Sequence, residues 1–270
     1  MLMLIFQSAL FAVVSFLASV AGAICGIGGG VVIKPVLDMF GWASISAISF
    51  LSGCTVLSMS CYTVGKSVIA GEKTVDLKLG TPLAVGAALG GAAGKQLFHL
   101  IKSMSANPNM VGGIQSACLA FITALTLIYS LNKSKIKTRQ VASAAVCVII
   151  GLILGILSSF LGIGGGPINL VFLYYFFRME TKIAAANSLY IILFSQITSL
   201  VTTLITQTVP EFPPITLVFM VIGGILGGMA GRAVNKKIDS HAVERLFLYL
   251  MGAIILISIG NAWKYLSVPQ

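Results

Sequence analysis

Two long apolar segments of this chain are interrupted at the same internal place by the same five residues. Gly26-Ile27-Gly28-Gly29-Gly30 returns as Gly162-Ile163-Gly164-Gly165-Gly166, each time after a long apolar run and before a short apolar stretch. Glycines this dense expose backbone amides and let the chain turn where a side chain would clash. Inside a bilayer such a break is tolerated only where it lines a cavity or is buried in protein. The duplication therefore predicts one site built from two halves.

The sequence around the breaks is typical of a membrane protein. Hydrophobic residues make up 57% of the chain and charged residues 9%, and the mean hydropathy is +1.02, whereas about a quarter of a soluble domain is charged. We expect an all-α integral membrane protein with about eight transmembrane helices, each long enough for about 30 Å of hydrocarbon, and two short half-helices that follow the glycine breaks. The apolar stretches cover residues 2–33, 42–64, 77–97, 110–131, 141–177, 183–208, 215–230 and 246–262.

The two halves of the chain correspond beyond the glycines, which indicates an internal duplication. The matched positions are Gly26 with Gly162 (162 − 26 = 136), Ser49 with Ser188 (188 − 49 = 139) and Gly90 with Gly227 (227 − 90 = 137). Gly94-Lys95 likewise matches Gly231-Arg232. We therefore divide the chain into a first transmembrane repeat at 1–131, a basic linker at 132–140 and a second repeat at 141–270.

The basic residues predict the orientation of the chain. If each half has a long helix, the break, a short returning segment and three crossing helices, 13 of the 17 basic residues fall on one side, which is the cytoplasmic side. We expect the linker in the cytoplasm, both termini outside, and the two repeats inverted relative to each other. Inverted repeats are typical of secondary transporters, which bind substrate near the midplane. The 13 residues are Lys66, Lys73, Lys78, Lys133, Lys135, Lys137, Arg139, Arg178, Lys182, Arg232, Lys236, Lys237 and Arg245.

The segments after the breaks suit an anionic ligand, because a helix N-terminus carries free amides and a positive partial charge. Uncharged donors in the facing segments either bind the oxygens of an anion or bond to neighbouring helices, and both roles stay open. Asn187 and Gln196 are the strongest candidates, because amides are hard to hide in lipid. Glycines that only allow close helix packing are the competing interpretation of the breaks. The candidate substrate-binding residues are Gly28, Gly29, Gly30, Ser49, Ser52, Gly164, Gly165, Gly166, Asn169, Asn187, Ser188 and Gln196.

Charged side chains refine this expectation. Lys34, close to the first break, either attracts an anion or extends to the outer interface. All seven acidic residues lie at segment ends or in loops, so we expect no buried carboxylate for a cation or a proton relay. An anionic substrate fits this pattern better than a cationic one.

Other classes of site and partner are disfavoured. The odd number of cysteines and the two distant histidines lack metal-like spacing, so we expect no metal, no cofactor and no catalysis. The net charge of +10 is explained by orientation signals, and no nucleic-acid partner is expected. The glycines spaced by four residues at 86, 90 and 94, and at 223, 227 and 231, are expected to pack helices closely.

The paired Gly-Ile-Gly-Gly-Gly segments, Pro35 after the first of them, and the Ala-x-Ser elements at Ala47 and Ala186 resemble the sulfite exporter TauE/SafE family, once called DUF81, over essentially the whole chain. The resemblance implies a bacterial or archaeal inner-membrane permease with about eight membrane helices. It also implies sulfite, sulfonates or related organic and sulfur oxyanions as substrates. Pro167, directly after the second glycine run, departs from the pattern of the first half.

We therefore predict a secondary transporter of small anions that works by alternating access around the two broken helices. A passive anion channel with the same constriction is the alternative. The expected partners are the anionic solute and the lipid bilayer, and a homo-oligomer is left open.

Overall fold

The computed structural model describes residues 2–72, 74–104 and 108–267, and its regular elements there are ten α-helices and one short 3-10 helix. Eight α-helices have 18 residues or more, and α2 and α7 have 11 each. Lys73, one of the basic residues counted above, lies outside the described residues. In chain order the helices are α1 (Leu2–Cys25), α2 (Gly30–Phe40), α3 (Ile45–Ile69), α4 (Leu77–Met104), α5 (Pro108–Asn132), η1 (Lys133–Lys135), α6 (Ala144–Leu161), α7 (Pro167–Phe177), α8 (Thr181–Ile205), α9 (Pro214–Lys237) and α10 (Ser240–Ser267).

The helices confirm the prediction of an all-α integral membrane protein. Seven of them, α1, α3, α5, α6, α8, α9 and α10, are long and apolar enough to cross a membrane. The remaining long helix, α4, is rich in glycine and carries Lys95 and Lys102. Large apolar side chains such as Phe121, Leu256 and Trp263 are exposed on the outside of the bundle, where lipid tails can cover them.

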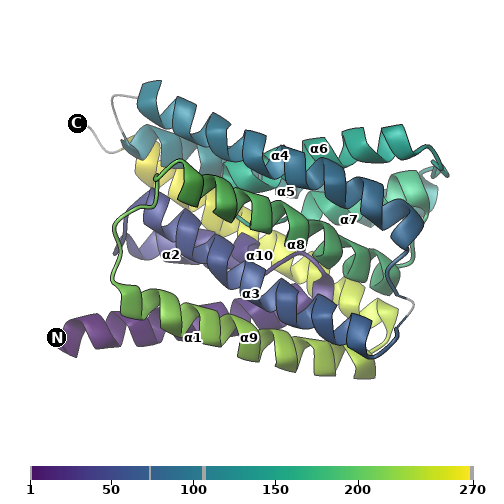
Figure 1. The fold of residues 1–270 in the computed structure, drawn as a ribbon, viewed down its shortest axis with the longest axis horizontal. Helices are drawn as coiled ribbons and strands as arrows, with labels where there is room; N and C mark the ends of the chain where they lie inside the picture. Colours follow the sequence, from purple (N-terminus) through teal and green to yellow (C-terminus); the bar gives the residue numbers. More distant parts are fainter. Residues whose placement is uncertain (1, 73, 105–107, 268–270) are drawn as a thin grey trace.

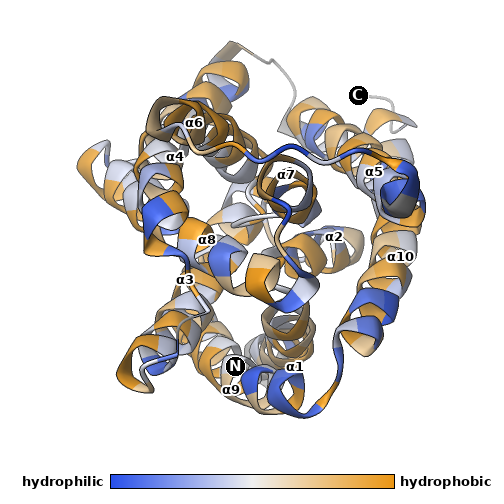
Figure 2. Ribbon diagram, turned by 90° about the vertical axis from the view of Figure 1, so that its right-hand side faces the viewer, coloured by the Kyte–Doolittle hydropathy of each residue, from blue (hydrophilic) through white to orange (hydrophobic). Residues whose placement is uncertain are grey.

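The loops gather at two ends of the bundle (Figure 1). Helix α1 begins and α10 ends at the left of that view, whereas the connections α3–α4, α5–α6, α7–α8 and α9–α10 lie at the right. We call the right-hand end, formed by residues 70–72, 74–76, 133–143, 178–180 and 238–239, the basic end. Three ion pairs join these segments to the adjoining helices. Lys236 Nζ and Arg232 Nη2 lie 2.7 and 2.8 Å from Glu72 Oε1, and Lys133 Nζ lies 2.7 Å from Glu244 Oε2. Seen from this end, α2 and α7 lie near the middle of the bundle (Figure 2).

Glycines let the long helices touch backbone to backbone. Helix α4 packs along α6, and α9 packs along α1. A Cβ atom added to Gly90 would collide with the carbonyl oxygen of Leu152, and one added to Gly227 would collide with that of Phe16. The neighbouring glycines of both seams meet backbone atoms in the same way. These contacts confirm that the glycines spaced by four residues serve close helix packing.

The contacts of the two halves mirror each other. Gly26 meets Ala185 and Gly162 meets Ser49, and both pairs of counterparts are 136 residues apart (162 − 26 and 185 − 49). Helices α3 and α8 also begin 136 residues apart (181 − 45). The match of Ser49 to Ser188 by sequence is therefore wrong by three residues, because the contacts of Gly26 and Gly162 make Ala185 the counterpart of Ser49. The same offset makes Ser188 the counterpart of Ser52 (188 − 52 = 136).

Helices α3 and α8 run in opposite directions. The start of α3, at Ser49 and Gly53, shares a cavity with Gln196 near the end of α8. The end of α3, at Ser67, shares another cavity with Lys182 at the start of α8. These antiparallel helices pack against each other, and both of them line each cavity.

Candidate functional site

The two glycine breaks meet inside the bundle. Gly28 and Gly164 have φ values of +76° and +65°, in the left-handed region that favours glycine. A Cβ atom on Gly28 would lie 3.3 Å from the carbonyl oxygen of Gly164, and one on Gly30 would collide with that of Ile163. We call this contact between residues 26–30 and 162–166 the glycine crossing. It brings together and buries all six glycines predicted as site residues, and it leaves little room between them.

Each break ends one helix and begins another. Helix α6 ends at Leu161, and Gly162 caps it in the left-handed conformation with φ of +65°. Helix α7 then begins at Pro167, where the missing amide of proline costs nothing in the first turn. Because α2 and α7 have equal length, the departure at Pro167 does not disturb the second short helix.

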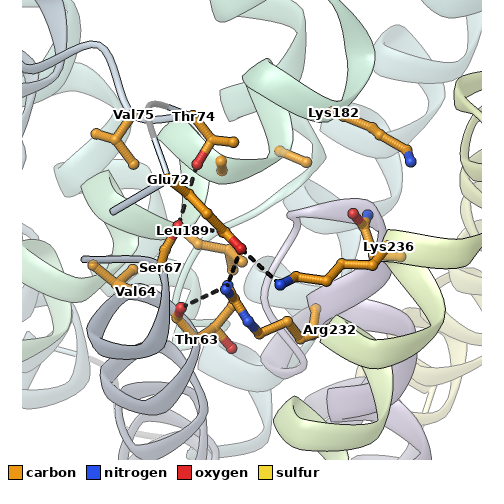
Figure 3. A pocket seen from close by; sticks show the side chains of 14 residues that line it. Thr63, Val64, Ser67, Glu72, Thr74, Val75, Lys182, Leu189, Arg232 and Lys236 are labelled. Carbon is orange, nitrogen blue, oxygen red and sulfur yellow. Dashed lines mark hydrogen bonds and ion pairs between the residues drawn. The ribbon is translucent and has the colours of Figure 1, made fainter. Parts of the chain in front are cut away.

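A cavity of about 260 Å³ lies at the basic end (Figure 3). We call it the basic-end cavity. Its lining comes from α1, α3, α8, α9 and the loop between α3 and α4. The polar members are Thr63, Ser67, Glu72, Thr74, Lys182, Arg232, Asn235 and Lys236.

Glu72 holds two cations in this cavity. Its Oε1 atom lies 2.8 Å from Arg232 Nη2 and 2.7 Å from Lys236 Nζ, and Oε2 accepts a hydrogen bond from Ser67 Oγ at 2.9 Å. The hydrogen bond from Lys236, with those from Ser67 and Arg232, lowers the pKa of Glu72 to about 2. With Lys182, the lining carries three cations and one carboxylate, so its net charge attracts anions.

A smaller cavity of about 20 Å³ lies toward the opposite end of the bundle. We call it the distal cavity. Its residues are counterparts of the basic-end lining: Ser199 corresponds to Thr63 (199 − 63 = 136) and Lys95 to Arg232 (232 − 95 = 137). Its polar lining is Ser49, Lys95, Ser158, Ser159, Gln196, Ser199 and Thr203.

Asn187 lines neither of these cavities. Its Oδ1 atom accepts a hydrogen bond from the amide of Asp76 at 3.1 Å, and Nδ2 donates to the carbonyl oxygens of Thr74 and Ile183 at 3.1 and 2.9 Å. Both amide hydrogens are therefore used within the protein. Asn187 ties the loop between α3 and α4 to α8, which is the structural one of the two roles that the sequence left open.

The other predicted polar residues are buried at separate places. Gln196 and Ser49 line the distal cavity. Asn169 lies beside a space of about 10 Å³ next to Gly165 and Gly166. Ser52 and Ser188 are fully buried in α3 and α8, outside the cavities described above.

Lys34 neither faces a ligand nor reaches the outer interface. Its Nζ atom lies 2.7 Å from Asp38 Oδ2, and both side chains are at most 3% exposed. The expectation that no carboxylate is buried is therefore wrong for Asp38. The residue stands at the end of an apolar segment, but α2 lies inside the bundle against α10, where Asn261 Nδ2 donates to the carbonyl oxygen of Pro35 at 2.8 Å.

Sequence reasoning missed Lys95, Arg232 and Glu72 as cavity residues. A signal was present, since Lys95 and Arg232 each follow the last glycine of a packing seam. That signal identified the repeat, but it did not show which cavity each side chain lines.

Lipid-facing helices, two helices broken at the centre and a cavity toward each end define a multi-pass membrane protein. The Sulfite exporter TauE/SafE family matches residues 11–258, and the chain therefore belongs to that family, which comprises membrane transporters. The chain is also similar to the "Probable membrane transporter protein YunE" of Bacillus subtilis (strain 168). They share 28% identity over 207 residues, which cover 69% of this chain and 74% of that protein. No solved structure matches the chain.

Proposed function

We propose that this membrane transporter is a secondary carrier of small anions that works by alternating access. The observation that carries the proposal is the pair of corresponding cavities, of about 260 and 20 Å³, on either side of the glycine crossing. Carriers built from inverted repeats open a central region to each side in turn by rocking one repeat against the other. Two corresponding cavities of unequal size fit a carrier that is open at one end and closed at the other.

The mirrored contacts and the antiparallel α3 and α8 support repeats at 1–131 and 141–270, joined by the linker at 132–140 and inverted in the membrane. The basic end then faces the cytoplasm, by the positive-inside rule, and both termini face outward. The proposed location is the inner, or plasma, membrane, as the family resemblance implies.

The charges around the cavities support an anionic substrate. Lys182, Arg232 and Lys236 outnumber Glu72 in the basic-end cavity, and Lys95 is the charged residue of the distal lining. The buried Asp38 is neutralised by Lys34 and leaves this balance unchanged. The family description names sulfite, and the proposal extends to sulfonates and related organic and sulfur oxyanions.

Export of an anion needs no ATP. With a cytoplasm negative by roughly 150 mV, expelling one negative charge is favoured by about 3.4 kcal/mol. At 1.4 kcal/mol per decade, this supports a gradient on the order of 300-fold.

The proposal is tested by measuring flux in proteoliposomes for a panel of anions: sulfite, thiosulfate, sulfonates and carboxylates. We expect saturable flux and counterflow for at least one sulfur oxyanion, and none in protein-free liposomes. A conductance that never saturates would instead favour a passive anion channel through the same constriction. Absence of flux for every anion would refute both.

A further inference from the structure

Lys95 is a buried cation without a carboxylate. Its side chain is 7% exposed, and in the described part of the chain the ion pairs are made by Lys34, Lys133, Arg232 and Lys236 instead. Its Nζ atom lies 5.5 Å from the centre of the Phe98 ring, a cation–π contact that offsets part of the cost of burial. Burying a charge without a counter-charge costs free energy, and a bound anion would offset that cost at this position.

The same cavity contains hydrogen-bond donors without acceptors. The hydroxyls of Ser49, Ser158 and Ser159 and the Nε2 atom of Gln196 have no partner among the described residues, and each side chain is at least nine-tenths buried. Leaving one such group unpaired costs about 1–3 kcal/mol. Hydroxyl and amide donors around an ammonium group are the groups that bind the oxygens of an oxyanion.

The distal cavity differs from its counterpart in both size and charge. At about 20 Å³ it has room for roughly one water molecule. The hydrogen-bond donors therefore lie close together around a cavity that is closed. In the basic-end cavity the counterpart cation, Arg232, is already paired with Glu72. The positions that correspond to Glu72 in the second repeat are Thr208 and Val209 (208 − 72 = 136 and 209 − 72 = 137), and neither can neutralise Lys95.

We propose that Lys95, Ser49, Ser158 and Gln196 form an oxyanion-binding site that opens to the distal side when the basic-end cavity closes. The inference rests on the proposed function and adds to it the residue that holds the charge of the substrate. A small oxyanion accepts hydrogen bonds from the ammonium group, the hydroxyls and the amide, and so supplies the acceptors that the protein lacks here.

Charge-removing and charge-keeping variants test the site. For the best-transported sulfur oxyanion, we expect Lys95→Gln to raise the KM for entry from the distal side at least tenfold, or about 1.4 kcal/mol. Lys95→Arg, which keeps the charge, should raise the KM less than Lys95→Gln does. Lys102→Gln is the matched control, because Lys102 lies on the same helix, is exposed, and donates to Ser46 Oγ at 2.9 Å outside this cavity. Wild-type KM in Lys95→Gln would overturn the inference while leaving the proposed transport intact.

Cys54 gives a readout that does not depend on transport, because it lines the same cavity. In a chain whose other four cysteines are alanine, methanesulfonate should slow labelling of Cys54 by a membrane-impermeant maleimide added from the distal side. Protection should persist in Lys95→Arg and disappear in Lys95→Gln. Absence of protection with Lys95 present would refute the site, even if Lys95→Gln fails to fold. Protection without any flux would instead count against the proposed function alone.

Discussion

Replacing Glu72 by glutamine should lower the KM of anions that enter from the basic end by about fivefold. An anion bound on the far side of the Arg232 guanidinium would lie roughly 5–6 Å from this carboxylate, where two unit charges repel by about 0.8 kcal/mol in water and about 3 kcal/mol at an effective dielectric constant of 20. The Glu72 side chain is 24% exposed, so solvent screening brings the repulsion toward the lower figure. We take about 1 kcal/mol, which corresponds to roughly fivefold.

Glutamine keeps an oxygen that can accept hydrogen bonds from Arg232 and Ser67, so the loop stays close to α9. The two lost ion pairs are partly exposed, and each is worth about 0–1 kcal/mol. Since the pKa of Glu72 lies near 2, below the ordinary value of 4.5, the carboxylate is ionised throughout the neutral range. The stability that it contributes is present above its ordinary pKa and is lost only as the pH falls toward 2.

The assay is the initial rate of uptake from the basic end into proteoliposomes of known orientation. Glu244→Gln is the matched control, because Glu244 pairs with Lys133 at 2.7 Å, also at the basic end, but does not line the cavity. Its KM should equal that of the wild type. If Glu72→Gln leaves the KM unchanged or raises it, the electrostatic reasoning is wrong.

Three further predictions test the packing and the polar contacts. Gly90→Ala should destabilise the protein by about 1–3 kcal/mol through overpacking between α4 and α6. Gly260→Ala, with open space around an added Cβ atom, should instead stabilise it by up to about 1 kcal/mol. Thermal unfolding in detergent measures both changes. Asp38→Asn should cost about 3–5 kcal/mol because it leaves Lys34 buried without its partner, and a double variant with Lys34→Met should recover most of that loss. Asn187→Ala removes the two hydrogen bonds, to Thr74 and Asp76, that hold the loop between α3 and α4, and faster tryptic cleavage at Lys78 should report its release.

The glycine breaks could be predicted from the sequence, because dense glycine within an apolar run has few tolerated structures in a membrane. The short helices follow the breaks as expected. The match of Ser49 to Ser188 failed because a short Ala-x-Ser element fits an apolar helix in more than one register, and only the contact between Gly162 and Ser49 fixes the offset. Asp38 was misjudged for a related reason: its place at the end of a segment does not reveal that α2 lies inside the bundle.

Arg232 and Lys95, the cations of the two cavities, differ in whether a carboxylate neutralises them, and this difference links substrate binding to the opening and closure of each cavity. When the basic-end cavity closes, Arg232 keeps Glu72 as a counter-charge, so that closure needs no ligand. When the distal cavity is closed, at about 20 Å³, Lys95 has no carboxylate beside it, and the proposed oxyanion can supply the missing charge only in the open cavity. On the proposed mechanism, the substrate therefore favours opening of the distal side more strongly than opening of the basic end. Because a ligand shifts a conformational equilibrium only by its differential affinity for the two states, Lys95 is the residue through which the anion acts on that equilibrium.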